Sequence, residues 1–363
     1  MVAPSTVLDE GKLGAALEAI AASAAERDRA CDPPFPEAAI AHLRDAGALE
    51  VNATPGPERP PASGELALVR AVAAADGSVG RIFDGHLNAV ERLAVQAPAD
   101  VRERELAAVH RGDLLAGVWG GNPRPGEGPP ATVGPDGTLS GVKTFCSGAG
   151  GLQRALVLAR DPACTEPVAV WIDVTDAHAV RVDRRWYRSA GLRASASHRV
   201  VFDDAPIIAR FGGPGSLAQF PWLSRDALRT AASWAGMADR ACRSALGELA
   251  ARPVSGPLED LAAGRMATAS QTITAWLERA AAAMDAVALD LPHLAVHARV
   301  AIADGCRTIL SEAARACGSH PFATGTDLDR ARRDLDLFLL QHRLDASVAE
   351  VGAELLSDLR RPA

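Results

Sequence analysis

The sequence has 363 residues, of which 48% are hydrophobic and 23% are charged, and its formal net charge at pH 7 is −7. This composition is typical of a globular protein with a large core and excludes a disordered chain. The net negative charge and the lack of a basic stripe argue against nucleic acid as a partner. The sequence contains no run of 18 apolar residues, so we expect no membrane partner.

The N-terminal sequence MVAPSTVLDE lacks the basic segment and apolar run of a secretory signal. The six cysteines include no C-x-x-C pair, so we expect reduced thiols in a cytoplasmic protein and no structural zinc. His293 and His297 have helical i, i+4 spacing but no third ligand in view, so we predict no metal site. Lys12 and Lys143 are the only lysines, a bias that we interpret as compositional.

Residues 1–113 have the apolar spacing of helices. We expect helices over 11–32, over 36–49 with Gly47 as a stop signal, and from Glu65 to about His110 with a break at Asp76–Gly77–Ser78. The stretch VNATPGPERPPASG between them is rich in Pro and Gly and predicts a loop.

Residues 114–208 change to short apolar runs that alternate with turn clusters. Pro135–Asp136–Gly137 is a strong turn signal. Runs of this length and spacing predict a small antiparallel barrel or sandwich.

Residues 209–363 return to helical spacing. Four long helices are expected, over about 222–251, 257–287, 290–318 and 327–357, and short connections favour an antiparallel bundle. The predicted fold class is α+β, mainly α. The chain has no G-x-G-x-x-G after a strand, no P-loop, no H-E-x-x-H and no G-x-S-x-G.

Four segments in this order resemble the acyl-CoA dehydrogenase superfamily of flavoproteins: 68–80, 141–160, 191–207 and 327–342. The resemblance implies an N-terminal helical domain (1–113), a middle β-barrel domain (114–208) and a C-terminal four-helix bundle (209–363). It also implies a flavin between the middle domain and the bundle, and a homodimer or homotetramer.

The family's dehydrogenases need a carboxylate base, and the usual one is missing here. The place of the Glu eight residues after the R-D pair is taken by His342, and the other known base position lies in a stretch with only Asp239. Members with a His near this place are monooxygenases that use reduced flavin from a partner reductase. The sequences TFCSGAG and SASH are also closer to that branch. The resemblance therefore implies His342 as a catalytic base or acid.

The same resemblance implies contacts to the flavin. Ser147 would hydrogen-bond the flavin N5 or O4 and is a second catalytic candidate. The other cofactor-binding candidates are Trp119, Gly120, Gly121, Asn122, Phe145, Arg252, Gly318 and Arg333. His86, Asn88 and His198 are candidates for the substrate pocket, and Ser195 and Ser197 lie beside His198.

The elements that hold the FAD adenine and pyrophosphate depart from the family pattern. R-x-x-F-G keeps only Arg252 and Gly256, and the element around Gly318 has lost its Gln. This departure favours reduced FMN or FAD held more loosely. Three functions remain open: a reduced-flavin monooxygenase acting on a small molecule with a flavin reductase as partner, an acyl-CoA dehydrogenase with a displaced base, and a relative without flavin.

Overall fold

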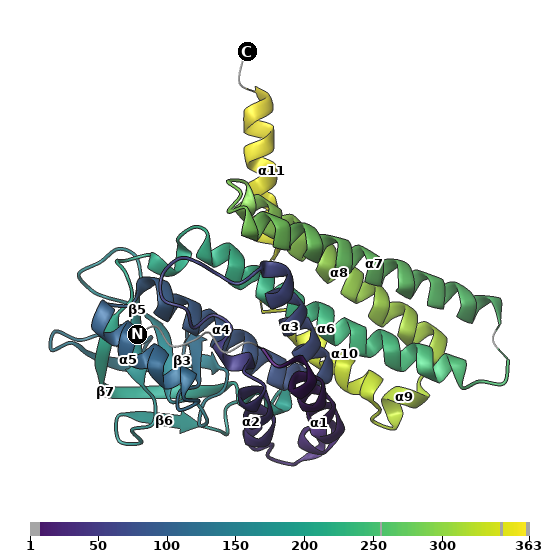
Figure 1. Cartoon of the computed structure of the whole chain (residues 1–363), viewed down its shortest axis with the longest axis horizontal. Helices are drawn as coiled ribbons and strands as arrows, with labels where there is room; N and C mark the ends of the chain where they lie inside the picture. Colours follow the sequence, from purple (N-terminus) through teal and green to yellow (C-terminus); the bar gives the residue numbers. More distant parts are fainter. Residues whose placement is uncertain (1–7, 255, 342–343, 361–363) are drawn as a thin grey trace. The chain divides into compact units, whose positions relative to one another are not determined.

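The computed structural model describes residues 8–254, 256–341 and 344–360 (Figure 1). The chain divides into two compact units. Unit 1 comprises Met1–Pro60, Ser78–Ser189 and Arg193–Trp222, and unit 2 comprises Pro61–Gly77, Ala190–Leu192 and Leu223–Ala363. Neither unit is one continuous stretch of chain, and the division into three domains read from the sequence stays a prediction.

The N-terminal region is helical as predicted. Its helices are α1 (Glu10–Arg29), α2 (Glu37–Asp45), α3 (Ala62–Ala75), α4 (Gly77–Gln96) and α5 (Ala99–His110), with a short 3-10 helix η1 (Ala48–Glu50). The prediction of uninterrupted helix from the 76–78 break to about His110 is wrong, because the chain leaves the helix before Pro98 and α5 starts after it. Asp9 caps α1 by accepting the Lys12 N–H at 3.0 Å, and Gly47, with a φ of 76°, follows α2 as predicted. Asp76 adopts an extended backbone between α3 and α4, which confirms the predicted break.

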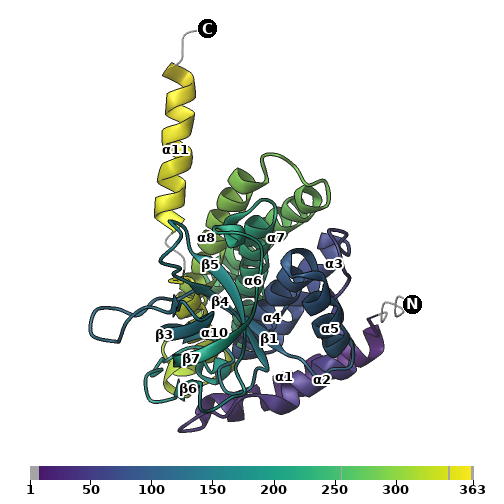
Figure 2. The same ribbon diagram turned by 90° about the vertical axis from the view of Figure 1, so that its left-hand side faces the viewer.

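Unit 1 contains a curled sheet (Figure 2). Its strands are β1 (Ala116–Trp119), β2 (Thr132–Val133), β3 (Thr138–Cys146), β4 (Arg154–Ala159), β5 (Val168–Asp173), β6 (Val180–Asp183) and β7 (His198–Arg210). The order is β1-β4-β5-β7-β3-β2, and β6 also pairs with β7. The turn at Pro135–Asp136–Gly137 joins β2 to β3, as predicted.

The expectation of an antiparallel sheet is wrong for one pair, because β1 and β4 are parallel. The chain between these two strands passes through β2 and β3, which gives the long crossover that a parallel pair needs. The core of unit 1 lies against this part of the sheet. Leu93 of α4, Val101 of α5 and Leu156 of β4 belong to one buried cluster with Trp171 and Phe211.

Unit 2 is helical. Besides α3 it contains α6 (Trp222–Ala250), α7 (Pro257–Asp285), α8 (Leu291–Cys317), α9 (His320–Ala323), α10 (Asp327–Phe338) and α11 (Leu344–Arg360). Helices α7 and α8 pack along each other, and α3 packs on α7 (Figure 1). Within the described ranges no helix is long and apolar enough to cross a membrane.

The prediction of one continuous helix over 327–357 is wrong. Helix α10 ends at Phe338, and the N–H groups of Leu340 and Gln341 bond three residues back, to the carbonyls of Leu337 and Phe338. Leu340 is 75% exposed and α11 contains no buried residue. The apolar spacing predicted an uninterrupted helix, but the run of buried residues that supports α10 stops at Leu339.

Candidate functional site

The turn that follows β1, residues 119–122, is fixed from one side by β3. The Lys143 Nζ donates to the Gly120 carbonyl at 3.2 Å and to Asn122 Oδ1 at 2.8 Å. The Thr144 N–H donates to the Gly121 carbonyl at 3.1 Å, and its hydroxyl donates to the Asn122 carbonyl at 3.0 Å. The carbonyls of Gly120, Gly121 and Asn122 therefore all bond to β3. A Cβ at Gly121 would collide with the Thr144 carbonyl oxygen, so the close approach requires glycine.

Trp119 connects this turn to a second turn, residues 145–150. Its buried indole N–H donates to the Ser147 carbonyl at 3.0 Å. Phe145, just before Ser147, has a φ of 53° and is 56% exposed. Its ring meets Trp186 edge to face, with centroids 4.9 Å apart. The exposed Phe145 ring is thus available for a planar ligand, whereas the Trp119 ring faces the core.

Three serines from two segments of the sequence, residues 145–150 and 193–197, form a row of buried, hydrogen-bonded hydroxyls that we call the serine chain. Ser147 Oγ lies 2.8 Å from Ser197 Oγ, which lies 2.8 Å from Ser195 Oγ. The Gly148 N–H donates to the Ser195 carbonyl at 2.8 Å, and this hydrogen bond joins the segments 145–150 and 193–197. Because a hydroxyl both donates and accepts, the serine chain allows the Ser147 hydroxyl to act towards a ligand as a hydrogen-bond donor or as an acceptor.

His198 begins β7 and pairs with Cys146 of β3. Burial lowers the pKa of His198, and the nearby Arg184 charge acts in the same direction. Its Nδ1 is buried and has no hydrogen-bond partner among the described residues. A neutral imidazole with an unsatisfied nitrogen fits the predicted role in ligand contact, which stays a prediction. Burial also raises the pKa of the Cys146 thiol, so that thiol is no nucleophile.

The two α4 candidates, His86 and Asn88, are both engaged within unit 1. His86 Nδ1 accepts the Ala116 N–H at 3.1 Å and its Nε2 lies 2.9 Å from the Leu49 carbonyl. Asn88 donates to Asp84 Oδ1 at 3.3 Å. Neither ring nitrogen of His86 is left for a substrate, so any contact it makes would be through the ring carbons. The geometry favours a role in joining α4 to β1.

We expect the buried neutral ring of His86 to make unit 1 sensitive to acid. Burial lowers its pKa from 6.5 to about 4. The unfolded chain therefore binds more protons than the folded chain between these values, and stability falls as the pH falls from 6.5 towards 4. The loss attributable to this residue is about 3 kcal/mol. Urea unfolding at several pH values should show a shallower acid dependence for His86→Gln; equal dependence in both proteins would contradict the assignment.

In unit 2, Arg333 and Asp334 of α10 hold the segment 190–192. The Leu192 N–H donates to Asp334 Oδ1 at 2.5 Å, and the Arg333 guanidinium donates to the Ala190 carbonyl and to Asp329. A Cβ at Gly191 would collide with the Arg333 carbonyl. Arg333 thus anchors a loop, and its predicted flavin contact stays a prediction.

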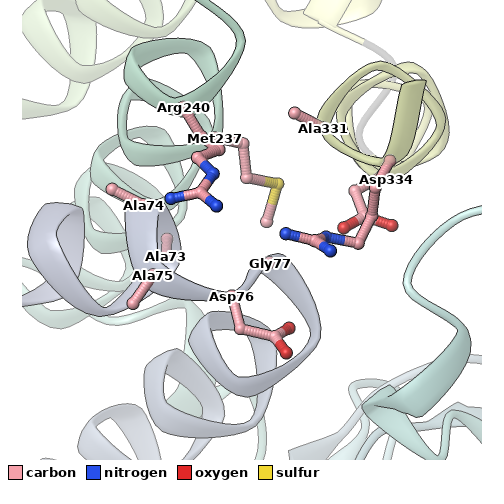
Figure 3. Close-up of a pocket in the computed structure, with 10 residues that line it drawn as sticks. Ala73, Ala74, Ala75, Asp76, Gly77, Met237, Arg240, Ala331 and Asp334 are labelled. Atoms are coloured by element: carbon pink, nitrogen blue, oxygen red, sulfur yellow. The ribbon is translucent and has the colours of Figure 1, made fainter. Parts of the chain in front are cut away.

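A small pocket, with room of about 10 Å³ for water-sized groups, lies beside Asp334 within the same unit (Figure 3). Asp76 and Gly77 line one side, and Met237 and Arg240 of α6 line another. Gly77 is tightly placed, because a Cβ there would lie 2.8 Å from Asp334 Oδ2. The pocket is too small for a flavin ring system, and we assign it no ligand.

Arg252 and Gly318 meet at the C-terminal end of α8. The Arg252 guanidinium donates to the Ala316 carbonyl at 3.0 Å, and Gly318, with a φ of 71°, ends the helix. These contacts explain both residues structurally, while their predicted cofactor role is a separate proposal. His342, the predicted base, lies outside the described residues. In the described ranges no cluster of three or more His, Cys, Asp or Glu could hold a metal ion.

Sequence reasoning did not select Lys143 or Thr144, although these two side chains fix the predicted cofactor turn. The available signal was a lysine on an apolar strand in a chain with only one other lysine. That signal was attributed to composition.

The fold is that of the acyl-CoA dehydrogenase-like proteins, which confirms the fold class expected from the sequence. Dibenzothiophene monooxygenase from Paenibacillus sp. A11-2 is similar over 97% of both chains, with 22% identity and a TM-score of 0.81, and it has also been solved with FMN bound. Methanesulfinate monooxygenase from Pseudomonas fluorescens is similar over 100% of this chain and 99% of its own, with 22% identity and a TM-score of 0.80. KijD3 in complex with dTDP is similar over 98% of both chains, with 23% identity and a TM-score of 0.82. No protein-family model and no curated protein sequence matches the chain.

Proposed function

We propose that this chain is the oxygenase of a two-component flavin monooxygenase. It would take reduced FMN or FAD from a separate cytoplasmic reductase, react it with oxygen and oxygenate a small molecule, as a homodimer or homotetramer. The observation that carries the proposal is the pair of turns, 119–122 and 145–150, held together by β3 and by the Trp119–Ser147 hydrogen bond in a protein of this fold. The serine chain fixes the Ser147 side chain in the second turn. The replacement of the dehydrogenase Glu by His342 supports a monooxygenase over a dehydrogenase.

The residues of the first turn fit the polar edge of a flavin ring. The N–H groups of Gly121 and Asn122 donate to no group among the described residues, whereas their carbonyls are engaged. A flavin offers acceptors at its ring nitrogens and carbonyls, so unengaged backbone donors are the complementary groups. Ser147 would add a hydroxyl, and the exposed Phe145 ring an apolar surface.

When bound, the flavin supplies the electrons and the reaction with oxygen. The chain's own residues orient it and control protons. In this proposal the turn at 119–122 positions the ring, Ser147 hydrogen-bonds its polar edge, and His342 moves a proton to or from the substrate. Of the substrate-pocket candidates, His198 has a ring nitrogen, Nδ1, without a hydrogen-bond partner among the described residues.

Anaerobic titration with reduced FMN and reduced FAD, followed by mixing with oxygen, tests the proposal. We expect micromolar or tighter binding of a reduced flavin, and oxidation of the bound flavin more slowly than in free solution. Binding of neither flavin in either redox state would contradict the proposal and favour a relative without flavin. Tight binding of oxidised FAD with turnover of a CoA thioester would instead identify an acyl-CoA dehydrogenase.

A further inference from the structure

Lys143 is a buried cation without an anionic partner. It lies on β3 with 1% of its surface exposed, whereas 66% of the side chain of Lys12 is exposed. Its hydrogen bonds go to the Gly120 carbonyl and the Asn122 side-chain oxygen, both uncharged. No carboxylate in the described part of the chain pairs with it. The neighbouring Cys146 offers no counter-charge, because burial keeps its thiol protonated.

A buried ammonium without a counter-charge lowers the stability of the folded chain, so we expect a function that accounts for Lys143. Burial of an unpaired ammonium disfavours its charged form, and the pKa of Lys143 is lowered to about 8 for this reason. The ammonium still has three N–H donors, of which two are used. A methionine of similar length would fill the same apolar space on β3 without the desolvation cost.

The hydrogen bonds of Lys143 and Thr144 determine which way the turn presents its peptide groups. In a trans peptide the carbonyl and the following N–H point in opposite directions. The Gly120 carbonyl bonds to Lys143, so the Gly121 N–H points away from β3. The Gly121 carbonyl bonds to the Thr144 N–H, so the Asn122 N–H also points away. The ammonium thus lies behind a pair of outward backbone donors.

We propose that Lys143 is a positioning residue that makes the turn at 119–122 select the anionic reduced flavin over the neutral ring of oxidised flavin. The proposal rests on the proposed function. Lys143 acts through the turn: by binding the Gly120 carbonyl it holds the Gly121 N–H outward, and its charge adds to the positive ends of both outward N–H groups. Reduced flavin near neutral pH carries a negative charge on its ring, and oxidised flavin does not, so only the reduced form gains from a cation behind the donors.

The test compares affinities for oxidised FMN and photoreduced FMN, measured anaerobically, in the wild type and in variants. We expect Lys143→Met to reduce the preference for the reduced form by about tenfold, the scale on which one unit charge acts on another inside a protein. Lys143→Arg should restore most of the preference, and Lys12→Met is the matched control that should not change it. The phosphate of FMN is common to both forms and cancels in the ratio.

An equal loss of both affinities in Lys143→Met would overturn the proposal, because it would show that Lys143 only supports the turn. A wild type that binds reduced FMN without preferring it would overturn the proposal while leaving the proposed function standing. A wild type that binds neither form would overturn both.

A second measurement needs no variant at the buried site. Labelling with ¹³Cε-lysine gives two lysine signals, which Lys12→Arg assigns. Reduced FMN should raise the pH midpoint of the Lys143 signal by more than oxidised FMN does, while the Lys12 signal stays unchanged. Equal midpoints with the two forms would overturn the proposal even if Lys143→Met fails to fold.

Discussion

Replacing Glu65 with alanine is expected to lower the free energy of unfolding by about 3–5 kcal/mol, the range for breaking a buried ion pair. Glu65 lies on α3 with its carboxylate fully buried, and it accepts from Arg225 at 2.8 Å and from Arg229 over a shorter distance. Both guanidiniums come from α6 and are themselves buried. Without Glu65, both guanidiniums lose this buried carboxylate, while Arg229 keeps the half-buried Asp226 at 3.2 Å.

Urea unfolding followed by circular dichroism measures this loss. Glu278→Ala, at an exposed position on α7, is the control and should change stability by less than about 0.5 kcal/mol. A loss below about 1 kcal/mol for Glu65→Ala would show that water or rearranged side chains satisfy the two arginines.

Replacing His342 with alanine is expected to slow substrate oxygenation by about 10²- to 10⁴-fold, the range for a lost general acid or base. The affinity for reduced flavin should stay within about twofold of the wild type, because the removed group acts on protons rather than on flavin binding. Single-turnover mixing of the reduced-flavin complex with oxygen and substrate measures the step directly.

The matched control is His297→Ala, which removes an exposed histidine from α8. It should leave the rate unchanged. Full turnover by His342→Ala would remove His342 from the mechanism and leave His198 as the next residue to test.

The helical elements could be predicted because their signals are local. Apolar spacing, Gly47 and the Asp76 break determined the ends of α1 to α3 and the start of α4 to within a few residues, whereas the break between α4 and α5 was missed. The break after Phe338 carries no such signal, since it reflects where packing stops rather than which residues favour helix. The parallel pairing of β1 with β4 was also missed, because pairing depends on the path of the whole sheet.

The candidate site was predictable residue by residue but not as a network. Ser147, Ser195 and Ser197 were each selected, yet the hydroxyl chain depends on two turns meeting in space. The engagement of both His86 nitrogens likewise needs the positions of Leu49 and Ala116. Lys143 was overlooked because an isolated lysine in a strand resembles a surface residue until its burial is known.

The interleaved composition of unit 2 has a consequence for biosynthesis. The Ala62 N–H at the start of α3 donates to Asp285 at the end of α7, 223 residues later. At about 5–20 residues per second, a ribosome needs roughly 10–45 s to make the intervening chain. For most of that interval, until α6 and then α7 are made, Leu66, Val69 and Val72 of α3 lack the helices of unit 2. The nascent chain therefore exposes an apolar helix early, and this helix is where we would look first for chaperone binding during translation.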